Sequence, residues 1–413
     1  MPLRWTMLLV LFLVRLAMGY QFQSVASVSS HLVDALGFSY VEVGTLIGLF
    51  LLPGIFIAIP SGLLTRAVTN KNLLMLGAVT MIAGALMMGT ADTPRELFAG
   101  RIVTGVGGTI FNVILTKMVT EWFLGREIVT ALAIMLTAWP IGISLGLLTQ
   151  GLIADAYGWP WAFYATGALA LVSLVLTATL YRDPAPDAGA TVQPIAFGLP
   201  RRQLVHISLV SIGWALFNAS LIVLVSFAPD VLVSHGYSPA RARSVVSLAM
   251  WAMLLSIPLG GRVLEVFGWI TVSIAATLSA AIACMVGIAY GIEPEILCVA
   301  FGLTAGIPAG ALVALSSEAL TAENRGPGLG IFYTGYYIGM AAGPALAGWT
   351  RDATGSVAAP VLLGAAMLVC VVLSVAALRL LQRVWPIEPP PCVSGQTPAA
   401  PARTIPGQAQ RVE

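Results

Sequence analysis

Charged residues are scarce in this chain. Asp, Glu, Lys and Arg together make up 9% of its 413 residues, whereas hydrophobic residues make up 58%. An ordinary soluble domain is about 25% charged. This chain therefore has too few polar side chains to cover the surface of a soluble fold, and its composition indicates an integral membrane protein.

Catalytic and metal-binding patterns are also missing from the sequence. The four cysteines are scattered without a CxxC pair, and only three histidines are present. The sequence has no HExxH motif, no GxxxxGK[ST] loop for a nucleotide and no Asp pair in facing helices. The formal net charge is only +2 and the basic residues are dispersed, which argues against nucleic acid as a partner. We expect no enzymatic activity, no cofactor and no metal site.

Long apolar runs dominate what is present. A membrane-spanning helix needs about 20 predominantly apolar residues, and polar residues divide this chain into twelve such segments. We therefore predict an all-α membrane protein with twelve transmembrane helices. The predicted spans are 5–29, 41–65, 72–91, 96–119, 128–151, 160–181, 204–229, 242–263, 270–290, 295–318, 327–349 and 357–381.

Three short motifs recur in the same order and at nearly one offset, which indicates an internal repeat. LGFS at 36–39 returns as HGYS at 235–238, and IPSG at 59–62 returns as IPLG at 257–260. The pattern G-x4-G-x3-D-x2-G begins at Gly146 and again at Gly343, so that its acids are Asp155 and Asp352. The prediction is two six-helix bundles of the same ancestry in parallel orientation.

The repeat and the polar segments give a domain plan. We expect an N-terminal bundle at 1–181, a central cytoplasmic loop at 182–203, a C-terminal bundle at 204–381 and a disordered cytoplasmic tail at 382–413. Lys and Arg concentrate on the side where both ends of the chain would lie. This bias places both termini in the cytoplasm.

Two parallel six-helix bundles joined by a cytoplasmic loop resemble the major facilitator superfamily, whose substrate site lies between the bundles. The family's fourth-helix pattern L-x3-R-x2-q-G is matched by Leu97, Arg101 and Gly105. The family's motif in the loop between helices 2 and 3 is only partly present, because Arg66 occupies the position of its acidic residue. The copy of this motif in the second half of the chain has Glu265 at that position. The residues for which the resemblance and the repeat imply a gating role are Gly62, Arg66, Lys71, Gly105, Asp155, Gly261, Glu265, Gly268 and Asp352.

Within the superfamily, two stretches are similar to the cyanate and nitrate permease-like branch of bacterial transporters. They are LGFSYVEVGTLIGLFLLPGIFIAIPSGLL and LTKMVTEWFLGREIVTALAI. The resemblance implies a multi-pass permease of the bacterial inner membrane that works by alternating access, and we expect a monomer in the lipid bilayer.

Two cations, Arg15 and Arg101, fall inside predicted spans. A charge near the bilayer centre costs about 2.5–3.5 kcal/mol on insertion scales, so each must face a cavity or a partner. Either arginine could bind an anion, Arg101 with two parallel hydrogen bonds. Alternatively, Arg101 could be a structural residue held by carbonyls of the first helix, as the resemblance implies. The same two alternatives, anion binding and a structural role, apply to Arg15.

Other intramembrane polar and aromatic residues extend this candidate site. Asn112 shares a helix face with Arg101, Gln21 lies in the polar half of the first helix, and a buried amide such as Asn218 needs partners. The predicted substrate-binding set is Arg15, Gln21, Arg101, Asn112, Trp214, Asn218 and Tyr336.

No acidic residue lies in the middle of a predicted span, which disfavours drug–proton antiport through a buried acid. Intramembrane cations without such an acid favour a small anionic substrate, moved by exchange or together with a proton. We predict a secondary active transporter of this kind. The alternatives are an exporter of neutral or amphipathic small molecules and a non-transporting sensor of the same fold.

Overall fold

The structure is a computed structural model, and it describes residues 3–57, 68–123, 127–183, 199–267, 269–321 and 324–387. In these ranges the regular elements are helices. Their bounds are α1 (Leu3–Ser27), α2 (Ser29–Leu36), α3 (Tyr40–Leu49), α5 (Asn70–Gly89), α6 (Pro94–Trp122), α7 (Ile128–Tyr157), α8 (Trp159–Thr179), α9 (Arg201–Ser234), α10 (Pro239–Phe267), α11 (Ile270–Ala289), α12 (Pro294–Gly306), α13 (Ala309–Glu318), α14 (Arg325–Thr354) and α15 (Ala359–Val384).

Eleven helical segments in the described residues are long and apolar enough to cross a membrane. One of them, Pro294–Glu318, combines α12 and α13 and is interrupted at Ile307 and Pro308. The remaining predicted span, 327–349, forms the 30-residue helix α14, which packs against α3, α9 and α15. The predicted all-α membrane fold is confirmed.

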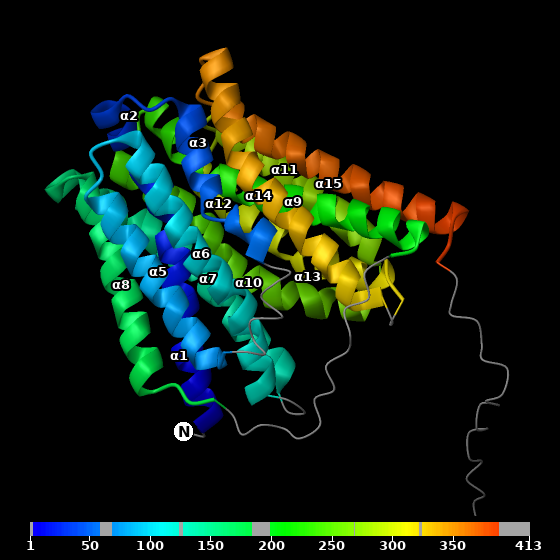
Figure 1. The fold of residues 1–413 in the computed structure, drawn as a ribbon. Helices are drawn as coiled ribbons and strands as arrows, with labels where there is room; N and C mark the ends of the chain where they lie inside the picture. Colours follow the sequence, from blue (N-terminus) through cyan, green and yellow to red (C-terminus); the bar gives the residue numbers. More distant parts are fainter. Residues whose placement is uncertain are drawn as a thin grey trace, which may run out of the picture.

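The helices form two groups that lie side by side (Figure 1). In the N-terminal group (α1–α8), α1 packs against α7, and α5 packs against α6 and α8. In the C-terminal group (α9–α15), α9 packs against α14, and α11 packs against α12 and α15. When the spans of each group are numbered in chain order, the first packs against the fifth, and the third packs against the fourth and the sixth, in both groups. Each group therefore repeats one packing arrangement.

Two of the three repeated motifs mark helix ends, while IPLG at 257–260 lies inside α10 and IPSG lies outside the described residues. In LGFS and HGYS, Gly37 and Gly236 have φ angles of +68° and +91°, a conformation that glycine adopts without steric cost. The glycines that close the longer repeat, Gly158 and Gly355, also have positive φ and follow α7 and α14. Ser39 then starts α3 with a capping box to Glu42. These two motifs therefore repeat the places where helices stop and start.

The two groups contact each other along two helix pairs, α3 with α14 and α7 with α10, and more sparsely between α1 and α9. The helix ends near Tyr40, Asp155 and Asp352 are here called the closed face. The opposite ends, near Leu3, Arg201 and Val384, are called the terminal face. The two groups diverge from the closed face toward the terminal face (Figure 1).

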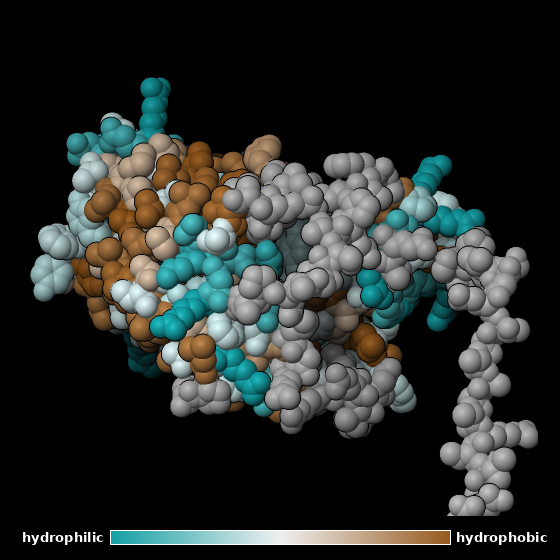
Figure 2. Space-filling view, turned by 60° about the horizontal axis from the view of Figure 1, so that its bottom comes forward, coloured by the Kyte–Doolittle hydropathy of each residue, from teal (hydrophilic) through white to brown (hydrophobic). Residues whose placement is uncertain are grey.

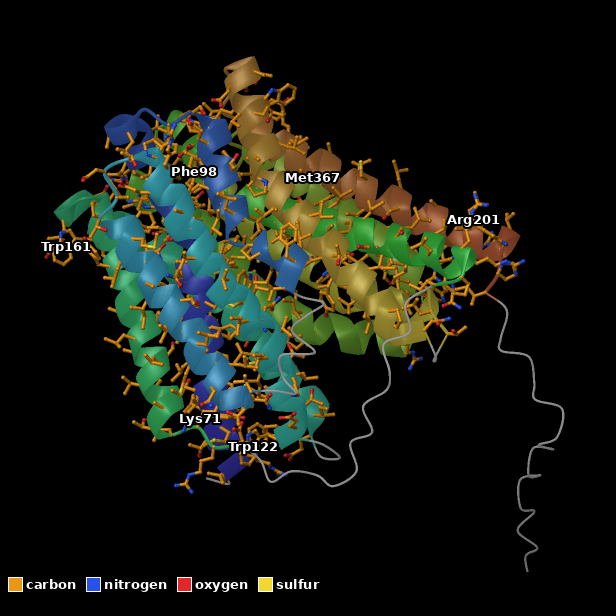
Figure 3. The ribbon with its side chains drawn as sticks, viewed as in Figure 1. Lys71, Phe98, Trp122, Trp161, Arg201 and Met367 are labelled. Carbon is orange, nitrogen blue, oxygen red and sulfur yellow. The ribbon has the colours of Figure 1, made fainter. Side chains whose placement is uncertain are left out.

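Figure 3 marks the two ends of the N-terminal group, with Lys71 and Trp122 near the start of α1 and Phe98 and Trp161 toward the closed face. Hydrophilic residues gather on the terminal face, beside a broad hydrophobic surface (Figure 2). Large apolar side chains such as Leu9, Leu171 and Leu373 are exposed on the outer sides of the helices. These sides suit contact with lipid, where a helix satisfies its own backbone hydrogen bonds.

Candidate functional site

One cluster joins the two groups near the middle of the helices, and it is here called the central cluster. Arg15 lies at the midpoint of α1 and is close enough to three tyrosines of α14 to interact with them electrostatically. Asn112 of α6 donates a hydrogen bond to the hydroxyl of Tyr337 at 3.0 Å. The members of the central cluster are Arg15, Asn112, Trp214, Tyr333, Tyr336 and Tyr337.

Arg15 is only 8% exposed, and its Nε has no hydrogen-bond partner. Among the residues that the structure describes, no carboxylate pairs with its guanidinium. A buried charge without a partner is costly. Arg15 is therefore a cation that faces the other group of helices and is available to bind an anion.

Aromatic rings form the wall opposite Arg15. The ring of Trp214 on α9 stacks against Tyr336 at a centroid distance of 6.3 Å and against Phe217 at 5.7 Å. Tyr336 in turn contacts Tyr333 and Tyr337 edge-on. Three of the predicted substrate-binding residues, Asn112, Trp214 and Tyr336, thus lie with Arg15 in one cluster.

Arg101 lies elsewhere, inside the N-terminal group. It is fully buried and donates to the carbonyl oxygens of Leu46 at 3.0 Å, Gln21 at 3.1 Å and Phe22 at 2.7 Å. Its guanidinium also lies 4.8 Å from the ring centroid of Phe50, a favourable cation–π distance. This arrangement matches the structural alternative, because Arg101 ties α6 to α1 and α3.

Two other predicted site residues lie outside the central cluster. Gln21 is buried against the N-terminal group, where its amide donates to the carbonyl of Met81 at 3.0 Å. Asn218 donates to the carbonyl of Trp214, one turn earlier on the same helix, at 2.8 Å. Neither contact points to a ligand.

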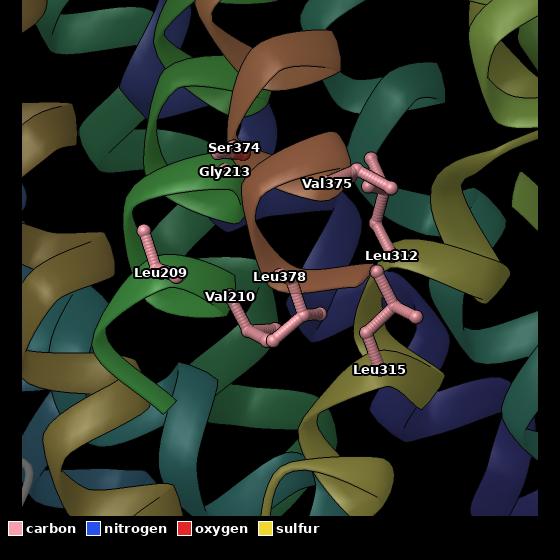
Figure 4. A pocket seen from close by; sticks show the side chains of 8 residues that line it. All are labelled: Leu209, Val210, Gly213, Leu312, Leu315, Ser374, Val375 and Leu378. Atoms are coloured by element: carbon pink, nitrogen blue, oxygen red, sulfur yellow. The ribbon is translucent and has the colours of Figure 1, made fainter. Parts of the chain in front are cut away.

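A pocket inside the C-terminal group is a poor site for a polar substrate (Figure 4). It lies between α9, α13 and α15, and its lining is apolar apart from Ser374. The lining residues are Leu209, Val210, Gly213, Leu312, Leu315, Ser374, Val375 and Leu378. We place the candidate site at the central cluster instead, because that is where a charge lacks a partner.

Asp352 links the two groups at the closed face. It accepts hydrogen bonds from the backbone amides of Tyr40 at 3.2 Å and Val41 at 2.8 Å, in the first turn of α3. Amides of a first turn have no partner within their own helix, and the helix dipole favours a carboxylate there. The neighbouring Arg351 pairs with Asp230 and donates to the hydroxyl of Tyr40.

Asp155, the matching acid of the repeat, links the groups on the other side. Its carboxylate pairs with Arg243 of α10 at 2.9 Å and with His31 of α2 at 3.0 Å. Gly151 leaves room for this contact, because a Cβ there would lie 2.2 Å from Cζ of Arg243. Each acid of the repeat therefore joins its own helix to the opposite group.

The remaining predicted gating residues lie within one group or outside the described residues. Lys71 donates to the carbonyls of Ala178 and Tyr181 at the end of α8. Gly105 packs on the backbone of Phe50, and Gly261 has open space around it. Gly62, Arg66, Gly268 and the side chain of Glu265 lie outside the part that the structure describes.

Close backbone contact between α3 and α14 predicts the effect of one substitution. A Cβ at Gly48 would lie 2.0 Å from the carbonyl oxygen of Ala341, so Gly48→Leu should force the two helices apart. We expect spin labels at the exposed positions Ala35 and Ala353 to report a longer distance by double electron–electron resonance. Gly310→Leu is the matched control, because a Cβ at Gly310 would have no described atom within 4 Å. An unchanged distance in Gly48→Leu would contradict this role of the contact.

Sequence reasoning missed several members of these contacts. Arg243 and His31 were assigned no role from the sequence, although both pair with Asp155. Tyr333 and Tyr337 were likewise not included in the predicted site. Their positions three and four residues apart on one helix, beside Tyr336, were the available signal.

The sequence profile of the family described as Major Facilitator Superfamily matches residues 8–238 and 209–406. Among curated relatives, the uncharacterized transporter YycB of Bacillus subtilis (strain 168) is 27% identical over 316 residues, covering 73% of this chain and 75% of the relative. The 3-(3-hydroxy-phenyl)propionate transporter of Escherichia coli (strain K12) is 28% identical over 262 residues, covering 60% of this chain and 62% of the relative.

Solved structures share the fold at low sequence identity. The nucleoside transporter NupG superposes with a TM-score of 0.72 at 16% identity, covering 92% of this chain and 99% of that one. A bacterial homolog of the human lysosomal transporter Spinster, in an inward-facing and unoccupied conformation, gives a TM-score of 0.68 at 15% identity. It covers 92% of this chain and 97% of that one.

Proposed function

Because the chain belongs to the major facilitator superfamily of transporters, we propose that it moves a small anion across the membrane by alternating access. The observation that carries this proposal is Arg15, a buried guanidinium without a partner in the described residues, which faces the tyrosines of the opposite helix group. A cation kept uncompensated at mid-membrane is stabilised when an anion binds. Arg101 has no such need, since three carbonyls already satisfy it.

In this proposal, the closed face is a gate that opens and closes as the two groups rock. Asp155 with Arg243 and Asp352 with the first turn of α3 hold the gate shut in the present conformation. Ion pairs that are partly exposed contribute only about 0–1 kcal/mol each, so they can break during a transport cycle. The terminal face, where the groups diverge, would then be the open side.

The anion is moved by exchange or together with a proton. In either mode, one bound anion neutralises the charge of Arg15. The proposed transporter is a monomer of the cyanate and nitrate permease-like branch. It lies in the bacterial inner membrane with both termini in the cytoplasm. The terminal face is then the cytoplasmic side, which supports an inward-open state.

The experiment is transport by purified protein in proteoliposomes. We expect carboxylic acids loaded inside to accelerate the uptake of labelled carboxylates outside, as an exchanger or a reversible symporter would. The matched control is the amide of each acid, which has the same shape without the charge. Equal uptake of acids and amides would instead favour the exporter of neutral molecules.

A further inference from the structure

We propose that the transported anion is a monocarboxylate attached to a planar aromatic ring. This inference rests on the proposed function, because it takes Arg15 as the group that receives the carboxylate. It goes further by assigning the rest of the substrate to the rings that face Arg15 from the C-terminal group.

The first support is the charge available in the cluster. Arg15 contributes one positive charge, while Arg101 is occupied by carbonyls, Arg243 by Asp155 and Arg351 by Asp230. A single uncompensated cation matches a single carboxylate. A second carboxylate on the substrate would be brought into the membrane without a counter-ion, which is costly.

The second support is the aromatic wall and the space before it. Tyr333 is 42% exposed even though it is close enough to Arg15 of the opposite group to interact with it. Trp214 and Tyr336 are only half-buried and present nearly parallel rings, with an interplanar angle of 28°. These rings therefore retain accessible surface, and the nearly parallel pair offers a face on which another planar ring can stack.

The third support is the distribution of hydrogen-bonding groups. Tyr333, Tyr336 and Tyr337 are close enough to Arg15 to interact with it electrostatically, and Asn112 donates a hydrogen bond to Tyr337. Polar groups thus lie beside Arg15, while the half-buried ring of Trp214 on α9 offers apolar surface. A substrate with one charged end and one flat apolar end fits this division.

The test compares phenylpropionate with cyclohexylpropionate, which has the same charge and carbon number but no planar ring. Uptake of each by wild-type proteoliposomes is measured by mass spectrometry. We expect half-saturation by phenylpropionate at a concentration about 3- to 10-fold lower, the range that one aromatic contact provides. Trp214→Leu should remove this preference, whereas Tyr336→Phe, which keeps the ring, should retain it. Trp269→Leu is the control, because that tryptophan is 73% exposed and lies at the start of α11, beside Arg379 near the end of α15.

The outcomes separate the inference from the function beneath it. Equal half-saturation by the two acids, with both preferred over their amides, overturns the aromatic assignment and leaves the anion proposal intact. No uptake of either acid overturns the aromatic assignment, and equal uptake of phenylpropionate and its amide overturns both proposals. The wild-type comparison decides the inference even if Trp214→Leu does not fold.

Discussion

Arg15→Gln should lower the affinity for the transported anion by about 10- to 150-fold while leaving the protein folded. Hydrogen bonds to a charged group contribute about 1.5–3 kcal/mol, and each 1.4 kcal/mol is a factor of ten in affinity. Glutamine keeps a polar side chain that can donate hydrogen bonds, but it is shorter and removes the charge. Half-saturating concentrations in proteoliposomes, measured with the carboxylate that wild-type protein transports best, give the comparison.

Thermal unfolding of the same variant tests the second half of this prediction. Arg15 has no hydrogen-bond or ion-pair partner in the described residues, so its substitution breaks no hydrogen bond or ion pair there and relieves a buried charge. We expect the melting temperature to stay equal or rise. The conservative Arg15→Lys should keep the charge, lose the planar fork and fall between wild type and Arg15→Gln in affinity. Wild-type affinity in Arg15→Gln would remove the basis of the anion proposal.

Arg101→Met should have the opposite signature, with a large loss of stability. The substitution keeps an unbranched side chain in the space but removes three charge-assisted hydrogen bonds and the contact with the ring of Phe50. The three carbonyls belong to helices, so they do not all become unsatisfied. We therefore expect the free energy of unfolding to fall by about 2–4 kcal/mol. This is more than one charge-assisted hydrogen bond contributes and less than the sum of three.

The measurement is chemical unfolding of purified protein in detergent, with Arg15→Gln as the matched control for loss of an intramembrane arginine. Native proteins are stable by only about 5–15 kcal/mol, so we also expect less folded Arg101→Met in the membrane. If Arg101→Met is as stable as wild type and loses anion affinity, then Arg101 binds substrate and the structural assignment is wrong.

Taken together, the two substitutions separate two roles that look alike in the chain. Arg15 and Arg101 both interrupt apolar helices, and both are almost completely removed from water. One is expected to govern binding without affecting folding, and the other to govern folding. The contrast follows from whether neighbouring backbone carbonyls reach the guanidinium.

Local features of the sequence determined where the helices lie. The length of an apolar run sets a membrane span, and glycines such as Gly37 and Gly355 end helices because they adopt positive φ without cost. These effects act within a few residues along the chain. Within the described residues, the predicted spans therefore lie on helices, and the repeat of Asp155 and Asp352 was readable as well.

Tertiary structure alone decided which polar groups meet. Arg243 reaches Asp155 across 88 positions of sequence, and Tyr337 reaches Asn112 across 225. Nothing in an apolar helix specifies which of its faces will meet a distant helix, or which arginine will find carbonyls there. The sequence placed two arginines in apolar helices. Only the packing of α1, α3, α6 and α14 gave Arg101 its carbonyl partners and left Arg15 without a partner in the described residues.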